Sequence, residues 1–391
     1  MENIKHICFI TQSFSRQDSL IVHRQGKSLV ESGYRVSYIL CDGKPEEVRY
    51  GIEMKSIDIT FNSFFYKLVS WEPHLKSRYL SWEKTRRLKN YLRDYDADIY
   101  QINDFEHLGL GSYLKKQGKK VVYDLREYFP IYYAKRRQCD IVRKWYQTIL
   151  EKRLTRHSKN YDAVFSCMPE MHDYIKNRVS STYFEDVANF PIVNKDFSLS
   201  YEEYVSRDKI ISYFGSIYKI SCQEVILDAI ERLPQVKYLL AGVFYDKQYQ
   251  EKVMSKPAWK QVTFINGFAR EDLPGIINNS IMGNVVKDFN QTETPQGSYS
   301  IIKIFETMEA AIPVILAKVP LYEKMVEKYH CGICVDPHSA DDFEKAISFL
   351  LNNPQEAYEM GQNGRKAVLA EYSWESQYSR YLNVLTKILQ S

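Results

Sequence analysis

Short apolar runs alternate with segments of helical periodicity along most of this chain. In the first half, the apolar runs predict strands at 6–11, 34–40, 98–102, 121–123 and 163–166. In the second half, they predict strands at 209–214, 236–240 and 314–316. Amphipathic segments lie between them, such as residues 20–32, which end at Gly33. This order is typical of an α/β fold with parallel sheets and right-handed crossovers.

The length of 391 residues favours two domains, each able to bury its own core. Hydrophobic residues make up 45% and charged residues 26% of the chain, as in ordinary globular proteins. Residues 192–208 are rich in Ser, Glu, Asp and Tyr and are interpreted as a linker. We therefore expect one domain over 1–195, a second over 205–371, and a closing helix over 373–391.

Cysteine usage and hydropathy favour a cytoplasmic protein. The seven cysteines have no disulfide-like spacing, no signal peptide is recognised, and no apolar run approaches the roughly 20 residues of a spanning helix. Cys331 and Cys334 have the spacing of a metal or redox pair, but no second pair accompanies them. The alternating pattern of residues 331–335 favours a buried strand, so no metal site is predicted.

The net charge of +4 is divided unevenly between the two halves. Residues 1–195 hold 33 Lys and Arg against 24 Asp and Glu, a net charge of +9, and the remainder holds 20 against 25. A long basic helix is predicted over 140–157. The basic half indicates an anionic partner, such as phospholipid headgroups, a lipid pyrophosphate or an acidic glycan. No nucleic-acid motif is present, so we expect no nucleic-acid partner.

Residues 61–93 combine aromatic and basic side chains. The aromatic and aliphatic members are Phe61, Phe64, Phe65, Tyr66, Leu68, Val69, Trp71, Tyr79, Leu80 and Trp82, and the basic members that follow are Lys84, Arg86, Arg87, Lys89 and Arg93. This combination suits peripheral contact with an anionic membrane surface, at its inner face. Packing within the domain, or an acceptor loop, would use the same residues, and both interpretations stay open.

The most specific pattern lies in residues 298–317. Apolar residues from Ile301 to Ala311 fall at helical spacing, and Lys303 and Glu306 share the other face. Pro313 then ends the helix before a short strand. The unpaired N–H groups of a helix N-terminus suit a phosphate, so this lysine and carboxylate could hold a pyrophosphate and a ribose. An amphipathic helix with a charged outer face gives the same pattern.

Residues 303–315, KIFETMEAAIPVI, resemble the Lys-Leu-Phe-Glu-Tyr-Met-Ala-Ala-Gly-x-Pro-Val-Ile signature of family 4 retaining glycosyltransferases. Residues 331–337, 353–354 and 360–365 resemble its continuation, and residues 187–191 its last strand before the linker. The resemblance implies the GT-B fold, in which two Rossmann-like doubly wound domains face each other across a cleft and the last helix returns to the first domain. It also implies a function in surface polysaccharide or glycoconjugate biosynthesis. A sugar would pass with retention from a nucleotide diphosphate sugar to a glycan or lipid-linked acceptor, without a metal or other cofactor.

On the donor side, the resemblance assigns Lys303 to the pyrophosphate and Glu306 to the ribose. The other donor-binding candidates are Gly215, Ser216, Lys219, Gly242, Gly267, Phe268, Ser298 and Ser300. A glycine after a strand lets a ligand approach the backbone closely, and Phe268 either stacks on the base or belongs to the edge of the core. Two positions depart from the family: Lys219 is the only cation in a loop that usually holds arginine, and Ser298 replaces a glutamate.

On the acceptor side, the candidates are Asp18, Asn103, Asp104, Arg126 and Glu127, and Asp104 and Arg126 join Lys303 and Glu306 as catalytic candidates. The family has histidines at positions 101, 103 and 126, which are Gln, Asn and Arg here. These side chains do not exchange protons near neutral pH, so Asn103 and Arg126 are interpreted as binding groups. Arg126 either holds an acidic group of a substrate or pairs with Glu127 or Asp124.

The lost histidines leave two alternatives to a transferase. One is a GT-B scaffold that binds a partner without catalysis, which would bind no nucleotide diphosphate. The other is a nucleotide-sugar epimerase, which would turn over without an acceptor. The chain lacks the Gly-x-Gly-x-x-Gly fingerprint, which argues against a nicotinamide or flavin enzyme.

Overall fold

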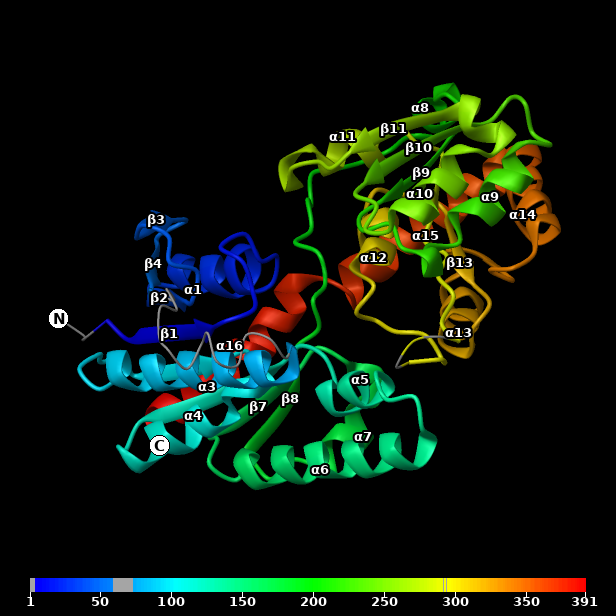
Figure 1. Cartoon of the computed structure of the whole chain (residues 1–391). Coiled ribbons are helices and arrows are strands. Elements are labelled where there is room, and N and C mark those ends of the chain that lie inside the picture. The colour runs from blue at the N-terminus through cyan, green and yellow to red at the C-terminus, as the bar shows by residue number, and fades with distance from the viewer. Residues whose placement is uncertain (1–3, 59–72, 291, 293) are drawn as a thin grey trace. The chain divides into compact units, whose positions relative to one another are not determined.

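The computed structural model describes residues 4–58, 73–290, 292 and 294–391, and the side chains of all of these except 73–78 (Figure 1). Two compact units share the chain. Unit 1 comprises Met1–Asn189 and Gln377–Ser391, and unit 2 comprises Phe190–Ser376. The first boundary therefore lies upstream of the predicted linker, and the second lies inside the last helix.

Within the described residues, unit 1 is built on an eight-stranded sheet in the order β3-β4-β2-β1-β5-β6-β7-β8. β3 pairs antiparallel with β4, and the other neighbours pair in parallel. The strands are β1 (His6–Thr11), β2 (Arg35–Leu40), β3 (Glu47–Arg49), β4 (Ile52–Ser56), β5 (Ile99–Ile102), β6 (Lys120–Leu125), β7 (Ala163–Ser166) and β8 (Tyr183–Asp186). The strand order reverses between β1 and β5, and open α/β sheets bind ligands at the carboxyl ends of the strands at such a point.

Helices pack on the sheet of unit 1. They are α1 (Lys27–Glu31), α3 (Pro73–Leu92), α4 (Leu108–Lys116), α5 (Phe129–Lys135), α6 (Asp140–Ser158), α7 (His172–Lys176) and the last helix, α16 (Trp374–Gln390). A π-helix, η1 (Ile21–Gly26), and two 3-10 turns, η2 (Phe105–His107) and η3 (Pro169–Met171), complete the described elements. α16 adds Leu385 and Ile388 to the buried core of this unit.

Unit 2 is built on a parallel sheet in the order β11-β10-β9-β12-β13-β14, which reverses between β9 and β12. The strands are β9 (Ile210–Phe214), β10 (Lys237–Gly242), β11 (Val262–Asn266), β12 (Met282–Asn284), β13 (Val314–Ala317) and β14 (Gly332–Val335). The α-helices are α8 (Tyr201–Ser206), α9 (Gln223–Ile230), α10 (Lys247–Met254), α11 (Leu273–Ile277), α12 (Ile302–Glu309), α13 (Pro320–Tyr329), α14 (Ala340–Asn352) and α15 (Pro354–Ala370). The 3-10 turns are η4 (Lys219–Ser221), η5 (Pro257–Gln261) and η6 (Arg270–Asp272).

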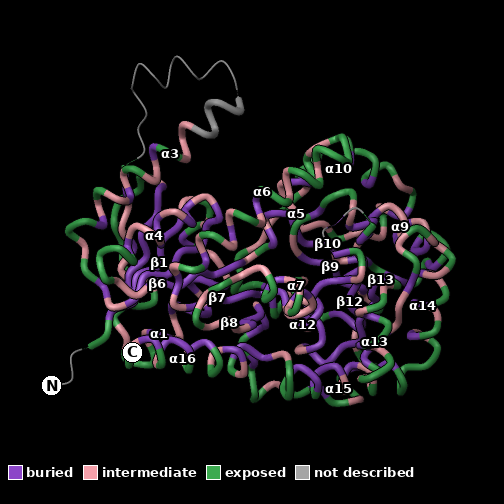
Figure 2. Tube along the Cα trace, turned by 90° about the horizontal axis from the view of Figure 1, so that it is seen from below, coloured by how far each residue is buried: buried purple, intermediate pink, exposed green. Residues whose placement is uncertain are grey.

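The central strands form the cores of both units. Every residue of β1 and of β13 is buried, and Figure 2 shows the strands as mostly buried segments beneath helices with exposed outer sides. Because helices cover both faces of a parallel sheet, its strands are continuous apolar runs rather than alternating patterns. These runs are the signal that made the strands predictable. The prediction of a strand at residues 331–335 is also confirmed, as β14.

The predicted helix over 20–32 is divided into the π-helix η1 and the short α1. The N–H of Gln25 reaches back five residues to the carbonyl oxygen of Leu20 at 2.8 Å, which makes the wider turn. Gly26 fits closely at the junction, because a Cβ there would lie 2.6 Å from Cδ1 of Ile52 on β4. Helical periodicity in the sequence does not reveal this tertiary fit.

Near the first boundary, one predicted strand is wrong and the predicted linker holds a helix that was not predicted. The strand expected over 187–191 is absent from the described structure, since β8 ends at Asp186 and Phe190 instead packs against Phe305, with ring centroids 4.6 Å apart. The expected linker over 192–208 contains α8. A reciprocal capping box between Ser200 and Glu203 begins this helix, and their Ser-x-x-Glu spacing is the sequence signal for it.

Candidate functional site

Three glycines meet where β9, β10 and β11 end in unit 2. Gly215 donates its N–H to Ala241 O at 2.9 Å, and Gly267 donates its N–H to Gly242 O at 3.1 Å. A Cβ on Gly242 would lie 1.9 Å from the carbonyl oxygen of Gly215, so only glycine fits there. Gly215 and Gly267 have φ values of 109° and 76°, which glycine adopts most readily. These predicted donor residues therefore form one surface of bare backbone, called here the glycine ledge (Gly215, Gly242 and Gly267).

Lys303, in the first turn of α12, lies beside this ledge. Its ammonium nitrogen is 3.3 Å from the Cβ position built on Gly215 and donates a hydrogen bond to the Tyr213 hydroxyl at 3.0 Å. In the part of the chain that the structure describes, Lys303 forms no ion pair. A lysine that forms no ion pair with a described residue, next to glycine backbone without side chains, is a suitable position for an anion such as a diphosphate.

The segment before α12 holds the two predicted serines. Ser298 is buried, and its backbone carbonyl accepts a hydrogen bond from the Tyr322 hydroxyl at 2.8 Å. Ser300 is exposed, and its N–H donates to Ser298 Oγ at 3.0 Å. The pair therefore shapes the entry to the helix, with Ser300 nearer to solvent.

Glu306 lies one turn after Lys303 and pairs with Arg270, which sequence reasoning missed. The Glu306 side chain is 6% exposed and the Arg270 side chain 39% exposed, so the arginine covers the carboxylate from the solvent side. Arg270 follows Gly267 by three residues, at the start of η6. The sequence signal for Arg270 was its position as a cation three residues after the glycine that follows β11.

The remaining donor candidates lie at the periphery. Ser216 and Lys219 are exposed, and Phe268 is half-buried. Among the described residues, no hydrogen bond or ion pair joins any of these side chains to Lys303. The structure thus brings together Lys303, Glu306 and the glycine ledge, and it leaves Ser216, Lys219 and Phe268 around them.

In unit 1, Asp104 bridges the two loops at the point where the strand order reverses. Its Oδ2 accepts hydrogen bonds from Thr11 Oγ1 at 2.8 Å and from the N–H of Gln12 at 2.7 Å. Burial raises the pKa of Asp104 above its usual value, since only 2% of the residue is exposed. Asp104 therefore fixes the loop after β1 to the end of β5.

A buried polar network lies beneath this loop. Gln101 Nε2 donates to Gln25 Oε1 at 3.0 Å and to Asn103 Oδ1 at 3.1 Å, and it lies 3.3 Å from Asp124 Oδ2. The Tyr381 hydroxyl of α16 donates to Gln101 Oε1 at 2.6 Å. Burial raises the pKa of Asp124, one of whose oxygens has no hydrogen-bond partner among the described residues. Asn103 is fully buried here and does not reach solvent.

Arg126 pairs with Asp18, whereas the sequence suggested Glu127 or Asp124 as its partner. Its Nη1 donates to Asp18 Oδ1 at 3.1 Å, and its guanidinium lies 4.8 Å from the centre of the Phe14 ring. Asp18 also accepts the N–H groups of Leu20 and Ile21 at 3.0 and 2.8 Å. The acceptor candidates Asp18 and Arg126 are thus brought together, whereas the Glu127 side chain is exposed.

Residues 200–367 match the family model described as "Glycosyl transferases group 1". Most of unit 2 is therefore similar to this family. Lys303, Glu306 and the glycine ledge all lie within the matched residues. A comparison with curated proteins gave no match.

Three solved structures resemble the whole chain. A sucrose-phosphate synthase from Thermosynechococcus elongatus aligns with a TM-score of 0.71 and 17% identity over 99% of both chains. Anabaena HepE, in complex with UDP and glucose, aligns with a TM-score of 0.68 and 14% identity over 98% of this chain and 100% of its own. WaaG, a glycosyltransferase involved in lipopolysaccharide biosynthesis, aligns with a TM-score of 0.66 and 13% identity over 96% of this chain and 98% of its own. At these identities the likeness shows the fold, which is GT-B.

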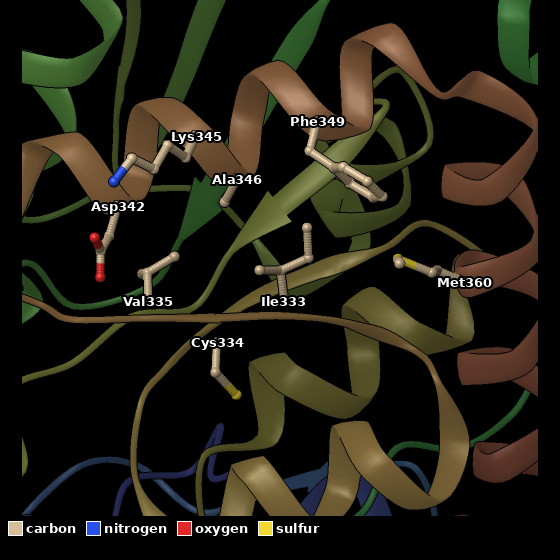
Figure 3. A pocket seen from close by; sticks show the side chains of 8 residues that line it. All are labelled: Ile333, Cys334, Val335, Asp342, Lys345, Ala346, Phe349 and Met360. Carbon is tan, nitrogen blue, oxygen red and sulfur yellow. The ribbon is translucent and has the colours of Figure 1, made fainter.

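A pocket of unit 2 lies beside β14, α14 and α15 (Figure 3). Its lining is mainly apolar and includes none of the predicted donor residues; it consists of Ile333, Cys334, Val335, Asp342, Lys345, Ala346, Phe349 and Met360. Burial raises the pKa of Cys334 to about 12, as it does for Cys331, so neither is a ready thiolate.

Two features are absent from the described residues. No group of three or more His, Cys, Asp or Glu side chains there is placed to hold a metal ion. No helix there is both long and apolar enough to cross a membrane.

Proposed function

We propose that the protein is a retaining glycosyltransferase that moves a sugar from a nucleoside diphosphate sugar to a glycan or lipid-linked acceptor. It would act in surface polysaccharide or glycoconjugate biosynthesis, in the cytoplasm, without a metal. The observation that carries this proposal is the Lys303 ammonium, 3.3 Å from the Cβ position of Gly215 and without an ion-pair partner among the described residues. The group 1 match supports the reaction, and the UDP complex of Anabaena HepE supports a uridine nucleotide as donor.

In this proposal, negative charge builds on the diphosphate as its bond to the sugar breaks. Lys303 stabilises that charge at close range, and the backbone of the glycine ledge lets the phosphates approach. A fixed ammonium group thereby does the work that a metal ion does in other transferases. Glu306 accepts hydrogen bonds from the ribose hydroxyls, and Arg270 stays beside it as a second cation at the rim.

The acceptor side of the proposal uses Arg126 of unit 1, whose side chain is 11% exposed, and its exposed neighbour Glu127. Arg126 has five N–H donors, and the Nη1 bond to Asp18 leaves others for an acidic group of the substrate. Glu127 is exposed and adjacent in sequence. Asp104 orders the loop in which this substrate would lie.

The test measures release of nucleoside diphosphate from UDP-, GDP- and ADP-sugars in the presence of EDTA, with and without glycan or lipid-linked acceptors. Acceptor-dependent release, with the anomeric configuration retained by NMR, is expected. Turnover of the nucleotide sugar alone would instead indicate an epimerase. A chain that no nucleoside diphosphate stabilises in thermal unfolding would be a scaffold.

A further inference from the structure

The outer side of α6 exposes four large apolar side chains. They are Ile141, Val142, Trp145 and Ile149, of which Ile141 is 80% exposed and Trp145 63% exposed. At about 100° per residue, these four positions fall within roughly 100° of the helix circumference. Leu150, Leu154 and Ser158 lie on the opposite, buried side. We call the exposed side, with Lys144, Thr148, Lys152 and Arg156, the α6 outer face.

Cations share this face with the apolar residues. Lys144, Lys152 and Arg156 are exposed and form no ion pair with any described residue. Residues 135–159 hold nine Lys and Arg against two Asp and Glu. Of the two acids, Glu151 is turned inward and accepts a hydrogen bond from the Tyr174 hydroxyl at 2.7 Å, and Asp140 pairs with Arg143 at 2.8 Å. The outer face therefore presents almost only positive charge.

We propose that the α6 outer face binds an anionic lipid bilayer. Tryptophan and isoleucine side chains would enter the boundary between headgroups and acyl chains, while lysine and arginine stems extend so that their charges stay among the headgroups. Figure 1 shows α6 as a long helix at the periphery of unit 1. Charge complementarity favours lipid over protein, because lysine is depleted in protein interfaces and enriched beside anionic membranes.

This surface differs from the one that the sequence suggested. The apolar residues 61–71 of the predicted membrane segment lie outside the described residues. In α3, Arg86 and Arg87 both pair with the buried carboxylate of Glu83, at 2.7 and 2.9 Å. Their charge is thus partly neutralised, whereas Lys144, Lys152 and Arg156 of α6 form no ion pair with any described residue. The inference is independent of the proposed transfer reaction.

The test is sedimentation of the full chain with vesicles of phosphatidylcholine, with and without phosphatidylglycerol. The double variant Ile141→Ser/Trp145→Ser should bind anionic vesicles about tenfold or more weakly. The matched control Val48→Ser/Trp82→Ser alters an aliphatic and a tryptophan side chain that are 71% and 59% exposed elsewhere in unit 1, and it should bind like the wild type. Lys152→Gln should lower binding about fivefold, and Lys247→Gln, at an exposed lysine of unit 2, should not.

Two readouts make the proposal falsifiable. Brominated lipids should quench a tryptophan signal that is absent from Trp145→Phe, which keeps an apolar side chain. Binding should weaken as salt rises. The proposal is overturned if wild-type protein ignores anionic vesicles at low salt, or if Val48→Ser/Trp82→Ser loses as much binding. It is also overturned if light scattering shows an oligomer that Ile141→Ser/Trp145→Ser dissociates, since the face would then bind protein.

Discussion

The two sheets place charged groups in opposite ways at the carboxyl ends of their central strands. In unit 1, Asp104 and Asp124 are buried in hydrogen-bond networks and Arg126 is paired with Asp18. In unit 2, Lys303 faces bare backbone and a neutral tyrosine hydroxyl. The first arrangement mainly stabilises the protein's own loops, whereas the second leaves a positive charge available to a ligand. Mutations should therefore affect stability in unit 1 and ligand affinity in unit 2.

The largest effect is expected for Arg126→Met in unit 1. It leaves the Asp18 carboxylate, whose side chain is 15% exposed, without its cation. Breaking such a pair costs about 3–5 kcal/mol when it is fully buried, so a loss toward the lower value is expected in urea unfolding. Adding Asp18→Asn should recover part of the lost stability, and strictly additive losses of the two substitutions would show that Arg126 and Asp18 are not coupled.

The substitution Arg126→His tests activity instead of stability, and we expect it to reduce sugar transfer. Unchanged turnover, or new turnover where there was none, would show that Arg126 does not bind an acidic group of the substrate.

Lys303→Ala tests the opposite side of the comparison. A hydrogen bond to a charged group contributes about 1.5–3 kcal/mol, so the affinity for UDP should fall roughly tenfold to a hundredfold in calorimetry. Uridine binding and the unfolding free energy should change little. Lys247→Ala, which removes an exposed cation of the same unit, is the control. Equal losses for UDP and uridine would show that Lys303 does not contact phosphate.

Tyr381→Phe should have a smaller effect on unit 1. It removes the hydroxyl that donates to Gln101 Oε1 at 2.6 Å and leaves a buried acceptor unpaired, at a cost of about 1–3 kcal/mol. Tyr378→Phe makes the same change three residues earlier, where the hydroxyl bonds to Ser32 at a more exposed position. Chemical denaturation should show the larger loss for Tyr381→Phe. A larger loss for Tyr378→Phe would mean that the buried network around Gln101 contributes little to the unfolding free energy.

The smallest effect concerns pH and Asp124. Burial raises the pKa of Asp124 in the folded state above its ordinary value of 3.8. The folded protein then holds this proton more tightly than the unfolded chain, so its contribution to stability declines as pH rises from 3.8 through the raised pKa. Asp124→Asn should therefore lose less stability than the wild type on titration from acid to neutral pH.

Local patterns made most of the fold predictable, and long-range contacts account for what was missed. In the sequence, the buried strands appear as short apolar runs, and the helix that holds Lys303 and Glu306 appears as apolar residues at helical spacing. Both signals lie within a few consecutive residues. The pairs Arg270–Glu306, Arg126–Asp18 and Tyr381–Gln101 join residues 36, 108 and 280 positions apart, which one sequence does not reveal. Likewise, the basic helix over 140–157 was predicted, but its exposed side depends on what packs against it.

The position of Tyr381 has a consequence for the order in which the protein is made. Domains usually fold as they leave the ribosome, the N-terminal one first. Here Gln101, on a central strand of the first sheet, accepts its hydrogen bond from the Tyr381 hydroxyl of α16. This part of α16 is synthesised after all of unit 2. The second unit can thus acquire its complete core while the first still lacks Tyr381, Leu385 and Ile388. During translation, unit 1 would be the one with an unfinished apolar surface, and a nascent chain stalled before residue 377 would leave that surface open to chaperones and proteases.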